Sequence, residues 1–166
     1  FGSRAPNVSS FNGLGISPGL GREMYAYERS GTNPTVSSAT VYMFNQGTGM
    51  WSNTGASVNS KNTGMGGAIQ FIGGAVDPAG NFYMGGYSTD GNAYRIYKYV
   101  PGSAVVTYVG YVDTSSIVGG TNGDMDFDKL GNLYITRCCG TSGTTVISVS
   151  APALASPGAN NRIAAT

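Results

Sequence analysis

Residues 123–136 read GDMDFDKLGNLYIT, and residues 74–84 read GAVDPAGNFYM. When Asp77 is aligned with Asp128, a Gly-Asn pair follows at the same distance in both segments, and a Tyr follows two residues after that Asn. Two segments 51 residues apart therefore share an Asp, a tight turn and an aromatic strand. Self-similarity at this spacing indicates a repeat architecture.

The shared pattern has the chemistry of a β-hairpin. The Asp opens the turn by hydrogen bonding to its own backbone, and the Gly-Asn pair accepts positive φ angles. Apolar residues alternate on both sides of the turn, as half-buried strands require. A weaker third copy, GLGISPGLGREMYAY at residues 13–27, has Ser17 in the place of the Asp and Tyr25 in the place of the Tyr. We therefore expect three related hairpins.

Further strands are predicted after each hairpin. Aromatic and β-branched residues favour a third strand at residues 39–45, 93–100 and 144–150. A fourth strand is predicted at 49–55 and at 104–112. Four strands in a unit of about 50 residues are the pattern of a propeller blade.

Two segments lack a strand pattern. The Ser- and Thr-rich residues 52–67 have no apolar period and predict a loop or a connection between blades. The segment APALASPGANN, residues 151–161, is rich in Pro, Ala and Gly and predicts an extended connector.

We predict an all-β, propeller-like fold with about three four-stranded antiparallel blades in a single module over residues 1–166. The approximate blades are 12–60, 68–115 and 122–166. An irregular β-sandwich or a solenoid is the alternative fold. Propellers close with about four to eight blades, so three blades predict a partial propeller or one completed by another chain or segment. A second copy would complete a six-bladed ring, or build a filament by head-to-tail contact.

The phrases VDPAGNFYMGG and FDKLGNLYIT, which contain the two hairpins, resemble the D-x-x-G-N-[LF]-Y phrase of β-propellers with NHL-like or lactonase-like blades. They also resemble the propeller-like repeat regions of large bacterial surface proteins and adhesins. A lactonase-like propeller implies a central metal held by Glu, Asn and Asp side chains from several blades. The only Glu residues are Glu23 and Glu28, and the partners that the resemblance suggests are Asn12, Asn122 and Asp124.

Composition excludes several function classes. Charged residues make up 10% of the chain and the net charge is +1, whereas a nucleic-acid-binding protein needs a basic surface to neutralise phosphates. No apolar run is long enough to cross a bilayer, so we expect neither nucleic-acid binding nor membrane insertion. The sequence has no His, which removes the usual general base and any Ser-His or Cys-His nucleophile. Low charge with abundant Gly, Ser, Thr and Tyr is typical of an extracellular or cell-surface β-protein.

Asp124, Asp126 and Asp128 occupy alternate positions in one of the hairpins. In a strand they would share one face, and three carboxylates on one face favour Ca²⁺ or another hard cation. The alternative is that these carboxylates are solvated or hydrogen bonded, because Asp128 already serves as the turn residue and Asp77 has no acidic neighbours. No other cofactor is expected.

Cys138 and Cys139 are adjacent and are the only cysteines of the chain. Their Cα atoms lie about 3.8 Å apart across a trans peptide bond, which is shorter than disulfides usually span. A vicinal disulfide therefore needs a strained turn, which Gly140 would help to form. Two free thiols and an intermolecular bridge are the alternatives.

Aromatic residues and one Arg supply the predicted ligand contacts. Arg95, Tyr97 and Tyr99 would share one face of a strand, and Trp51 is the only Trp. Tyr, Trp and Arg are common anchors of binding surfaces, and aromatic rings also stack on sugars. We therefore expect a protein or a glycan as the ligand, or further copies of the chain as partners. The alternative role of these residues is packing between blades.

These observations predict a non-catalytic binding or adhesion module on a rigid propeller-like scaffold. One alternative is a structural subunit of an extracellular assembly or filament whose chains join through strand edges. The other is a lactonase-like, metal-assisted hydrolase in the propeller channel.

Overall fold

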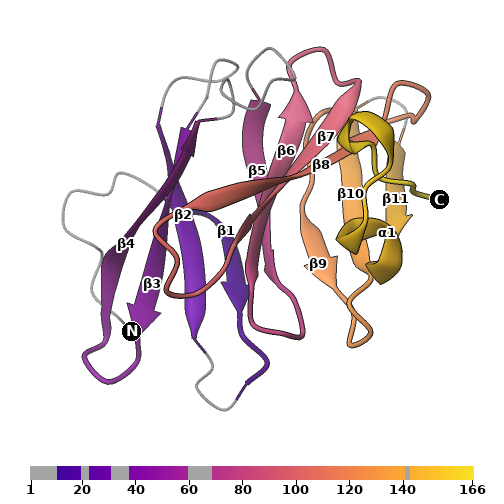
Figure 1. The fold of residues 1–166 in the computed structure, drawn as a ribbon. Helices are drawn as coiled ribbons and strands as arrows, with labels where there is room; N and C mark the ends of the chain where they lie inside the picture. Colours follow the sequence, from indigo (N-terminus) through magenta and orange to yellow (C-terminus); the bar gives the residue numbers. More distant parts are fainter. Residues whose placement is uncertain (1–10, 20–22, 31–37, 60–68, 141–142) are drawn as a thin grey trace.

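The computed structural model describes residues 11–19, 23–30, 38–59, 69–140 and 143–166. Three antiparallel sheets of four, four and three strands follow one another along the chain (Figure 1). Each sheet is a meander in which consecutive strands pair. The structure thus confirms the predicted all-β, propeller-like fold, and we call the sheets blades 1, 2 and 3.

The strands of each blade run in chain order from the inner strand outward. Blade 1 contains β1 (Phe11–Ile16), β2 (Met24–Ser30), β3 (Ser38–Asn45) and β4 (Met50–Asn59). Blade 2 contains β5 (Ile69–Val76), β6 (Phe82–Ser88), β7 (Ala93–Tyr99) and β8 (Val106–Asp113). Blade 3 contains β9 (Met125–Phe127), β10 (Leu133–Gly140) and β11 (Gly143–Val149).

The C-terminal residues lie beside β11, where the other two blades have their fourth strand. Thr166 and Ser148 exchange two backbone hydrogen bonds, of 2.8 and 2.9 Å. The backbone N–H of Ile163 donates to the carbonyl oxygen of Tyr111 in β8 at 2.8 Å. This segment therefore joins blade 2 to blade 3.

The two repeated turns have the same hydrogen bonds. Asp77 Oδ1 accepts from the backbone N–H groups of Ala79 and Asn81, both at 2.9 Å, and its Oδ2 accepts from Asn81 Nδ2 at 2.8 Å. Asp128 makes the same three bonds, at 2.8 to 2.9 Å, with the side-chain bond coming from Asn132. The glycine before each Asn has a positive φ, of 88° and 82°. The repeat in the sequence therefore corresponds to a repeated turn in the structure.

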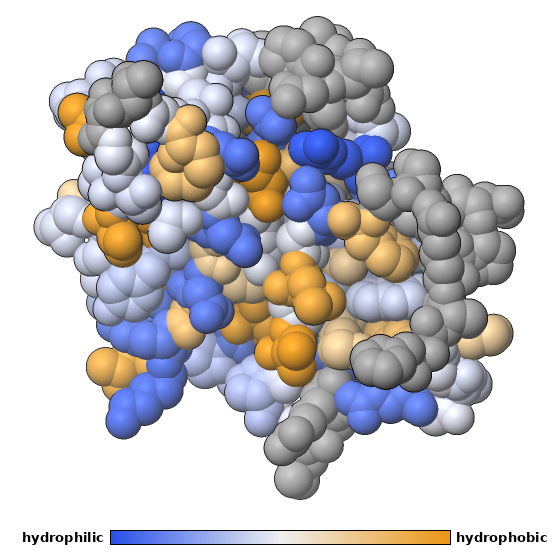
Figure 2. All heavy atoms as spheres, turned by 180° about the vertical axis from the view of Figure 1, so that it is seen from behind, coloured by the Kyte–Doolittle hydropathy of each residue, from blue (hydrophilic) through white to orange (hydrophobic). Residues whose placement is uncertain are grey.

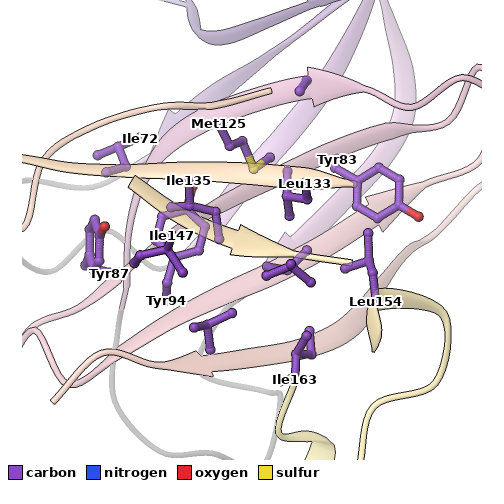
Figure 3. Packing of buried hydrophobic residues seen from close by; sticks show 14 residues of the cluster. Ile72, Tyr83, Tyr87, Tyr94, Met125, Leu133, Ile135, Ile147, Leu154 and Ile163 are labelled. Carbon is purple, nitrogen blue, oxygen red and sulfur yellow. The ribbon is translucent and has the colours of Figure 1, made fainter. Parts of the chain in front are cut away.

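Two hydrophobic cores fill the spaces between the blades. The core between blades 1 and 2 is largely aromatic, and its members include Tyr25, Tyr27, Phe71, Phe82 and Tyr97. Figure 3 shows the core between blades 2 and 3, which includes Tyr83, Tyr87, Tyr94, Met125, Leu133, Ile135, Ile147, Leu154 and Ile163. Burying such a side chain stabilises the fold by about 1.5–3 kcal/mol. Each blade therefore depends on its neighbour for stability.

The loop predicted at residues 52–67 is wrong over residues 52–59, which belong to β4. Ala56 is buried and Val58 is partly buried in the core between blades 1 and 2, whereas their neighbours are polar. An outer strand needs few apolar residues to pack on one face, which is why the polar composition suggested a loop. Residues 60–67 of the predicted loop lie outside the described residues.

The extended connector predicted at residues 151–161 is also wrong, because it contains α1 (Ala151–Ala155) and the 3₁₀ helix η2 (Ala159–Asn161). The Ser150 side chain caps α1 by accepting from the backbone N–H of Ala153 at 3.4 Å. Neither helix of the described chain is long and apolar enough to cross a membrane.

Candidate binding groove

The inner strands β1, β5 and β9 border a groove of about 500 Å³. Side chains from all three blades face it, among them Leu14, Ile16, Asp124, Asp126, Tyr134 and Thr136. In Figure 1, β8 passes in front of β1 and β5. Figure 2 looks from the opposite side, where hydrophobic side chains gather near the middle and hydrophilic side chains lie beside them.

Glycines bring β1 and β5 close together beside this groove. A Cβ on Gly74 would lie 2.8 Å from the Cα of Gly13, so a larger residue would push the two backbones apart. Gly13 also has a positive φ of 58°, which favours glycine. The close approach of these strands is therefore encoded by the glycines of the inner strands.

The polar wall of the groove comes from blade 3. The backbone N–H of Asp124 donates to Thr136 Oγ1 at 2.7 Å, and the backbone N–H of Thr136 donates to the Asp124 carbonyl oxygen at 2.8 Å. Asp126 lies directly opposite Tyr134 in the β9–β10 ladder. The ladder thus holds two carboxylates, a hydroxyl group and an aromatic ring along one edge.

The opposite wall comes from β1 and is apolar. Leu14 and Ile16 are 56% and 54% exposed, and Tyr134 is 39% exposed. An exposed pair of aliphatic side chains facing carboxylates is a mixed surface. It can accept hydrogen bonds on one side and pack against an apolar face on the other.

The three aspartates of the predicted metal site do not converge. Asp124 Oδ1 and Asp126 Oδ1 each accept the backbone N–H of the next residue at 2.8 Å. The Asp128 carboxylate is used in the turn, where the hydrogen bond from Asn132 lowers its pKa below the ordinary value. Among the described residues, no group of three or more His, Cys, Asp and Glu side chains is arranged to hold a metal ion. The Ca²⁺ site therefore remains a prediction that this geometry does not support.

The residues suggested by the lactonase resemblance make local hydrogen bonds instead of a shared site. Asn12 Oδ1 and Asn122 Oδ1 each accept the backbone N–H of the following glycine, at 3.0 and 3.1 Å. Glu23 accepts from the hydroxyl of Tyr25 at 2.7 Å, and Glu28 accepts from Tyr42 at 3.3 Å.

The ligand-binding prediction for Arg95, Tyr97 and Tyr99 does not fit their burial, since these residues are 4%, 0% and 3% exposed. Tyr97 and Tyr99 pack in the core between blades 1 and 2. Their rings stabilise the fold, and a ligand on the surface would not reach them. The blade-packing role that the sequence left open is therefore the one that the structure supports.

Trp51 lies away from the groove, on blade 1. Its ring centroid is 4.7 Å from that of Phe11 and 5.4 Å from that of Phe44, and it is partly buried. A ligand-binding role for Trp51 remains a prediction.

A disulfide joins Cys138 and Cys139 at the end of β10. Cys139 has a positive φ of 69°, and the register between β10 and β11 shifts at this point. A Cβ on Gly120 would lie 2.6 Å from the carbonyl oxygen of Cys138, so the preceding loop packs closely against the pair. Neither Cys lines the groove.

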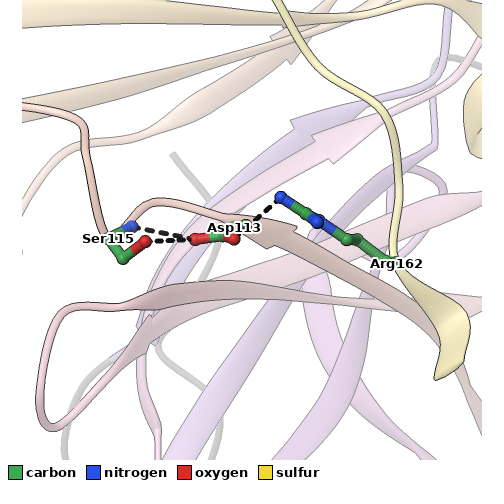
Figure 4. A network of polar contacts seen from close by, with 3 residues as sticks. All are labelled: Asp113, Ser115 and Arg162. Atoms are coloured by element: carbon green, nitrogen blue, oxygen red, sulfur yellow. Dashed lines mark hydrogen bonds and ion pairs between the residues drawn. The ribbon is translucent and has the colours of Figure 1, made fainter.

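A second cleft, of about 670 Å³, lies between β8, β11 and the C-terminal residues. Arg162 Nη2 donates to Asp113 Oδ2 at 2.8 Å in this cleft (Figure 4). Ser115 donates to Asp113 Oδ1 through its hydroxyl and its backbone N–H, and these bonds lower the pKa of Asp113 more than Arg162 does. The two charged lining residues satisfy each other, which makes the groove of the inner strands the stronger candidate site.

Sequence reasoning found only the two aspartates of the groove and missed its other lining residues, among them Leu14, Ile16, Tyr134 and Thr136. Tyr134 could have been predicted from the register of the hairpin, because that register places Tyr134 opposite Asp126. The groove-lining position of β1 could have been predicted from the repeat alignment, because the first strands of the three copies become the inner strands of three adjacent blades.

No protein-family model matches this sequence, and no curated protein matches it either. Solved structures do match. A protein of unknown function from Dyadobacter fermentans has a TM-score of 0.52 and 14% identity, over 85% of this chain and 38% of its own. A gluconolactonase from Xanthomonas campestris has a TM-score of 0.50 and 13% identity, over 99% of this chain and 50% of its own.

Identities this low show the fold alone. The present chain spans half or less of the length of these two proteins. The likeness to a lactonase-type propeller agrees with the predicted propeller-like fold. The NHL-like and adhesin-like parts of the resemblance gain no support from these matches.

Proposed function

We propose that this protein is a non-catalytic binding module whose inner-strand groove takes a carbohydrate. The observation that supports this proposal best is the position of Asp124 and Asp126 beside the exposed ring of Tyr134, opposite Leu14 and Ile16. These residues form one surface of hydrogen-bond acceptors and apolar groups.

A sugar matches both halves of this surface. Its hydroxyl groups donate hydrogen bonds, which carboxylate oxygens accept strongly. Its C–H face is apolar and packs against aromatic and aliphatic side chains. The groove volume of about 500 Å³ lies within the usual range for small-molecule sites, about 300–1,000 Å³.

Binding is favoured over hydrolysis by the side chains that are present. The sequence has no His to act as a general base, and the groove carboxylates accept backbone N–H groups. Likeness to the gluconolactonase concerns the fold and brings no catalytic residue to this groove. The proposal includes the extracellular or cell-surface location expected from composition.

A glycan array followed by calorimetric titration tests the proposal. We expect at least one glycan to bind, and we expect Asp126→Asn and Tyr134→Ala each to weaken its binding about tenfold or more, which corresponds to about 1.4 kcal/mol. Val146→Ala is the matched control, since Val146 is 58% exposed on the neighbouring strand and lies outside the groove. An array without any bound glycan would contradict the proposal.

The same protein should be incubated with gluconolactone, with and without added Ca²⁺. We expect hydrolysis no faster than in buffer. Hydrolysis that is faster than in buffer and is lost in Asp124→Asn would favour the hydrolase and overturn the non-catalytic part of the proposal.

A further inference from the structure

A smaller hollow, of about 320 Å³, lies next to the groove on blade 3, and we call it the side hollow. Polar side chains line much of it, namely Asn132, Ser148, Ser150 and Thr166. Tyr134 lines both the side hollow and the groove. The two spaces therefore meet at one aromatic ring.

The strand ladders of blade 3 place the two spaces side by side. Tyr134 of β10 lies directly opposite Asp126 of β9 and directly opposite Ser148 of β11. Ser148 in turn exchanges two backbone hydrogen bonds with Thr166. Directly opposed residues have their side chains on the same face of a sheet, so these four residues form one row across the blade. Neighbouring strands lie about 4.8 Å apart, so the row extends over roughly 14 Å.

This row lies on the face of blade 3 that is turned away from blade 2. Leu133 and Ile135, the neighbours of Tyr134 along β10, are buried in the core between blades 2 and 3. Because side chains alternate between the two faces of a strand, Tyr134 points the other way and is exposed. Its hydroxyl donates to Asp128 Oδ2 at 3.4 Å, which helps to fix the position of the ring on this face.

The two ends of the row differ in hydrogen-bonding chemistry. Ser148 Oγ and Thr166 Oγ1 lie 3.0 Å apart and share a hydrogen bond. Two hydroxyl groups carry two O–H donors, and the bond between them uses one. The pair can therefore donate a hydrogen bond to a ligand and also accept one, whereas the ionised carboxylates Asp124 and Asp126 can only accept.

The charges along the two spaces narrow the class of ligand. Among the described residues that line the groove and the side hollow, Asp124 and Asp126 are the only charged ones. An acidic ligand would be repelled by these carboxylates without a Lys or Arg in either lining to compensate. An uncharged ligand with several hydroxyl groups can donate to the carboxylates and can also accept from the Ser148–Thr166 pair.

We infer that the ligand is an uncharged oligosaccharide, with one sugar unit in the groove and the next unit in the side hollow. The first unit donates hydrogen bonds to Asp124 and Asp126, and the second exchanges hydrogen bonds with the Ser148–Thr166 pair. The exposed ring of Tyr134 packs against apolar C–H groups where the two units join. This inference rests on the proposed function and adds to it the charge class of the sugar and a second binding subsite.

Calorimetric titration with the glycan found on the array, and with its one-unit and two-unit fragments, tests the second subsite. We expect the two-unit fragment to bind about tenfold or more tightly than the single sugar, which corresponds to about 1.4 kcal/mol. A single sugar that binds as tightly as the two-unit fragment would overturn the second subsite. Tighter binding of an acidic glycan than of its uncharged counterpart would overturn the charge class.

Two variants remove a hydroxyl group from the side hollow and leave the groove lining intact: Ser148→Ala and Thr166→Ala. We expect each to weaken binding of the two-unit fragment about threefold or more, because a hydrogen bond is lost, and to leave binding of the single sugar unchanged. Asp126→Asn should weaken the binding of both sugars. Thr144→Ala is the matched control, since it removes an exposed hydroxyl from the same strand, β11, and Thr144 lines neither space.

The outcomes separate this inference from the proposed function. A glycan whose affinity falls in Asp126→Asn but is unchanged in both Ser148→Ala and Thr166→Ala would remove the second subsite alone and leave the groove as the binding site. An array without any bound glycan would overturn both. A crystal structure of the complex should show the two sugar units on either side of the Tyr134 ring, and two units that both lie on the β1 side of that ring would overturn the second subsite.

Discussion

Each repeated turn is organised by one carboxylate that accepts the same three hydrogen bonds. Asp128 Oδ2 also accepts a bond from the Tyr134 hydroxyl at 3.4 Å. In Asp128 these bonds favour the ionised form, and the bond from Asn132 contributes most to its lowered pKa. A group whose pKa is lower in the folded state contributes stability above its unfolded pKa. That contribution is lost as the pH falls through the folded pKa. In the Asp128 turn, the carboxylate therefore stabilises the fold through its charge as well as through the geometry of the turn.

We expect Asp77→Ala and Asp128→Ala each to lower the melting temperature by a few degrees at neutral pH, because the backbone N–H groups of the turn lose their acceptor. Lys129→Ala, in the same turn, should have no effect because its side chain is exposed. Differential scanning calorimetry measures these shifts.

The deficit of Asp128→Ala should shrink as the pH falls below the ordinary range of an Asp carboxyl and through the lowered folded-state pKa of Asp128, because the parent carboxylate then becomes protonated as well. A deficit that is equal at neutral and acidic pH would show that the turn does not use the charge of Asp128.

At the scale of elements, Arg137 of β10 connects blade 3 to the loops of blade 2. Its guanidinium donates to the carbonyl oxygens of Gly91 (3.0 Å), Thr114 (2.7 Å) and Gly119 (3.1 Å), and it lies over the ring of Tyr87. Arg137 is buried, so these bonds replace its hydration. The planar guanidinium reaches three carbonyls at once, which a Lys cannot do.

We expect Arg137→Met to lower the free energy of unfolding by about 2–4 kcal/mol, because three charge-assisted hydrogen bonds to carbonyl oxygens are lost. Arg137→Lys should recover part of the loss. The control is Arg162→Met, which removes an ion pair whose Arg side chain is 61% exposed and should cost about 0–1 kcal/mol. Urea unfolding measures the free energy of unfolding of all three variants. Equal losses for Arg137→Met and Arg162→Met would contradict the role of Arg137 in holding blade 3 to the loops of blade 2.

At the scale of the whole molecule, tyrosines hold the blades together. Burial raises the pKa of Tyr25, Tyr27 and Tyr94 well above the ordinary value, and it raises the pKa of Tyr87 to about 12. In the unfolded chain these groups would ionise near pH 10. The unfolded state therefore binds fewer protons than the folded state at high pH, and stability falls as the pH rises.

We expect the contribution of these tyrosines to the free energy of unfolding to be independent of pH below about pH 10. Above that pH we expect the protein to unfold cooperatively. Tyrosinate absorbance and the loss of β-sheet circular dichroism should change together as the pH rises. A gradual rise of tyrosinate absorbance in a protein that stays folded would show that the buried rings are accessible to hydroxide without unfolding.

Local chemistry made much of the fold predictable. The expected strand at 93–100 is β7 (Ala93–Tyr99), and the one at 144–150 is β11 (Gly143–Val149). Turn residues and alternating apolar positions act over a few residues, so they can be read in order along the chain. The end of β4 and the helix α1 were mispredicted because packing against other segments, and a capping Ser, outweighed composition there.

The sequence alone determined the hairpins, their repetition and the all-β class, since those depend on residues that are close along the chain. Only the tertiary structure decided the groove, because Leu14, Val76 and Asp124 come from three different blades. It also decided that Tyr97 and Tyr99 are core residues, since a strand pattern does not tell which face a neighbouring blade will cover. Contacts between blades join residues that are far apart in the chain, and no local pattern encodes which of them meet.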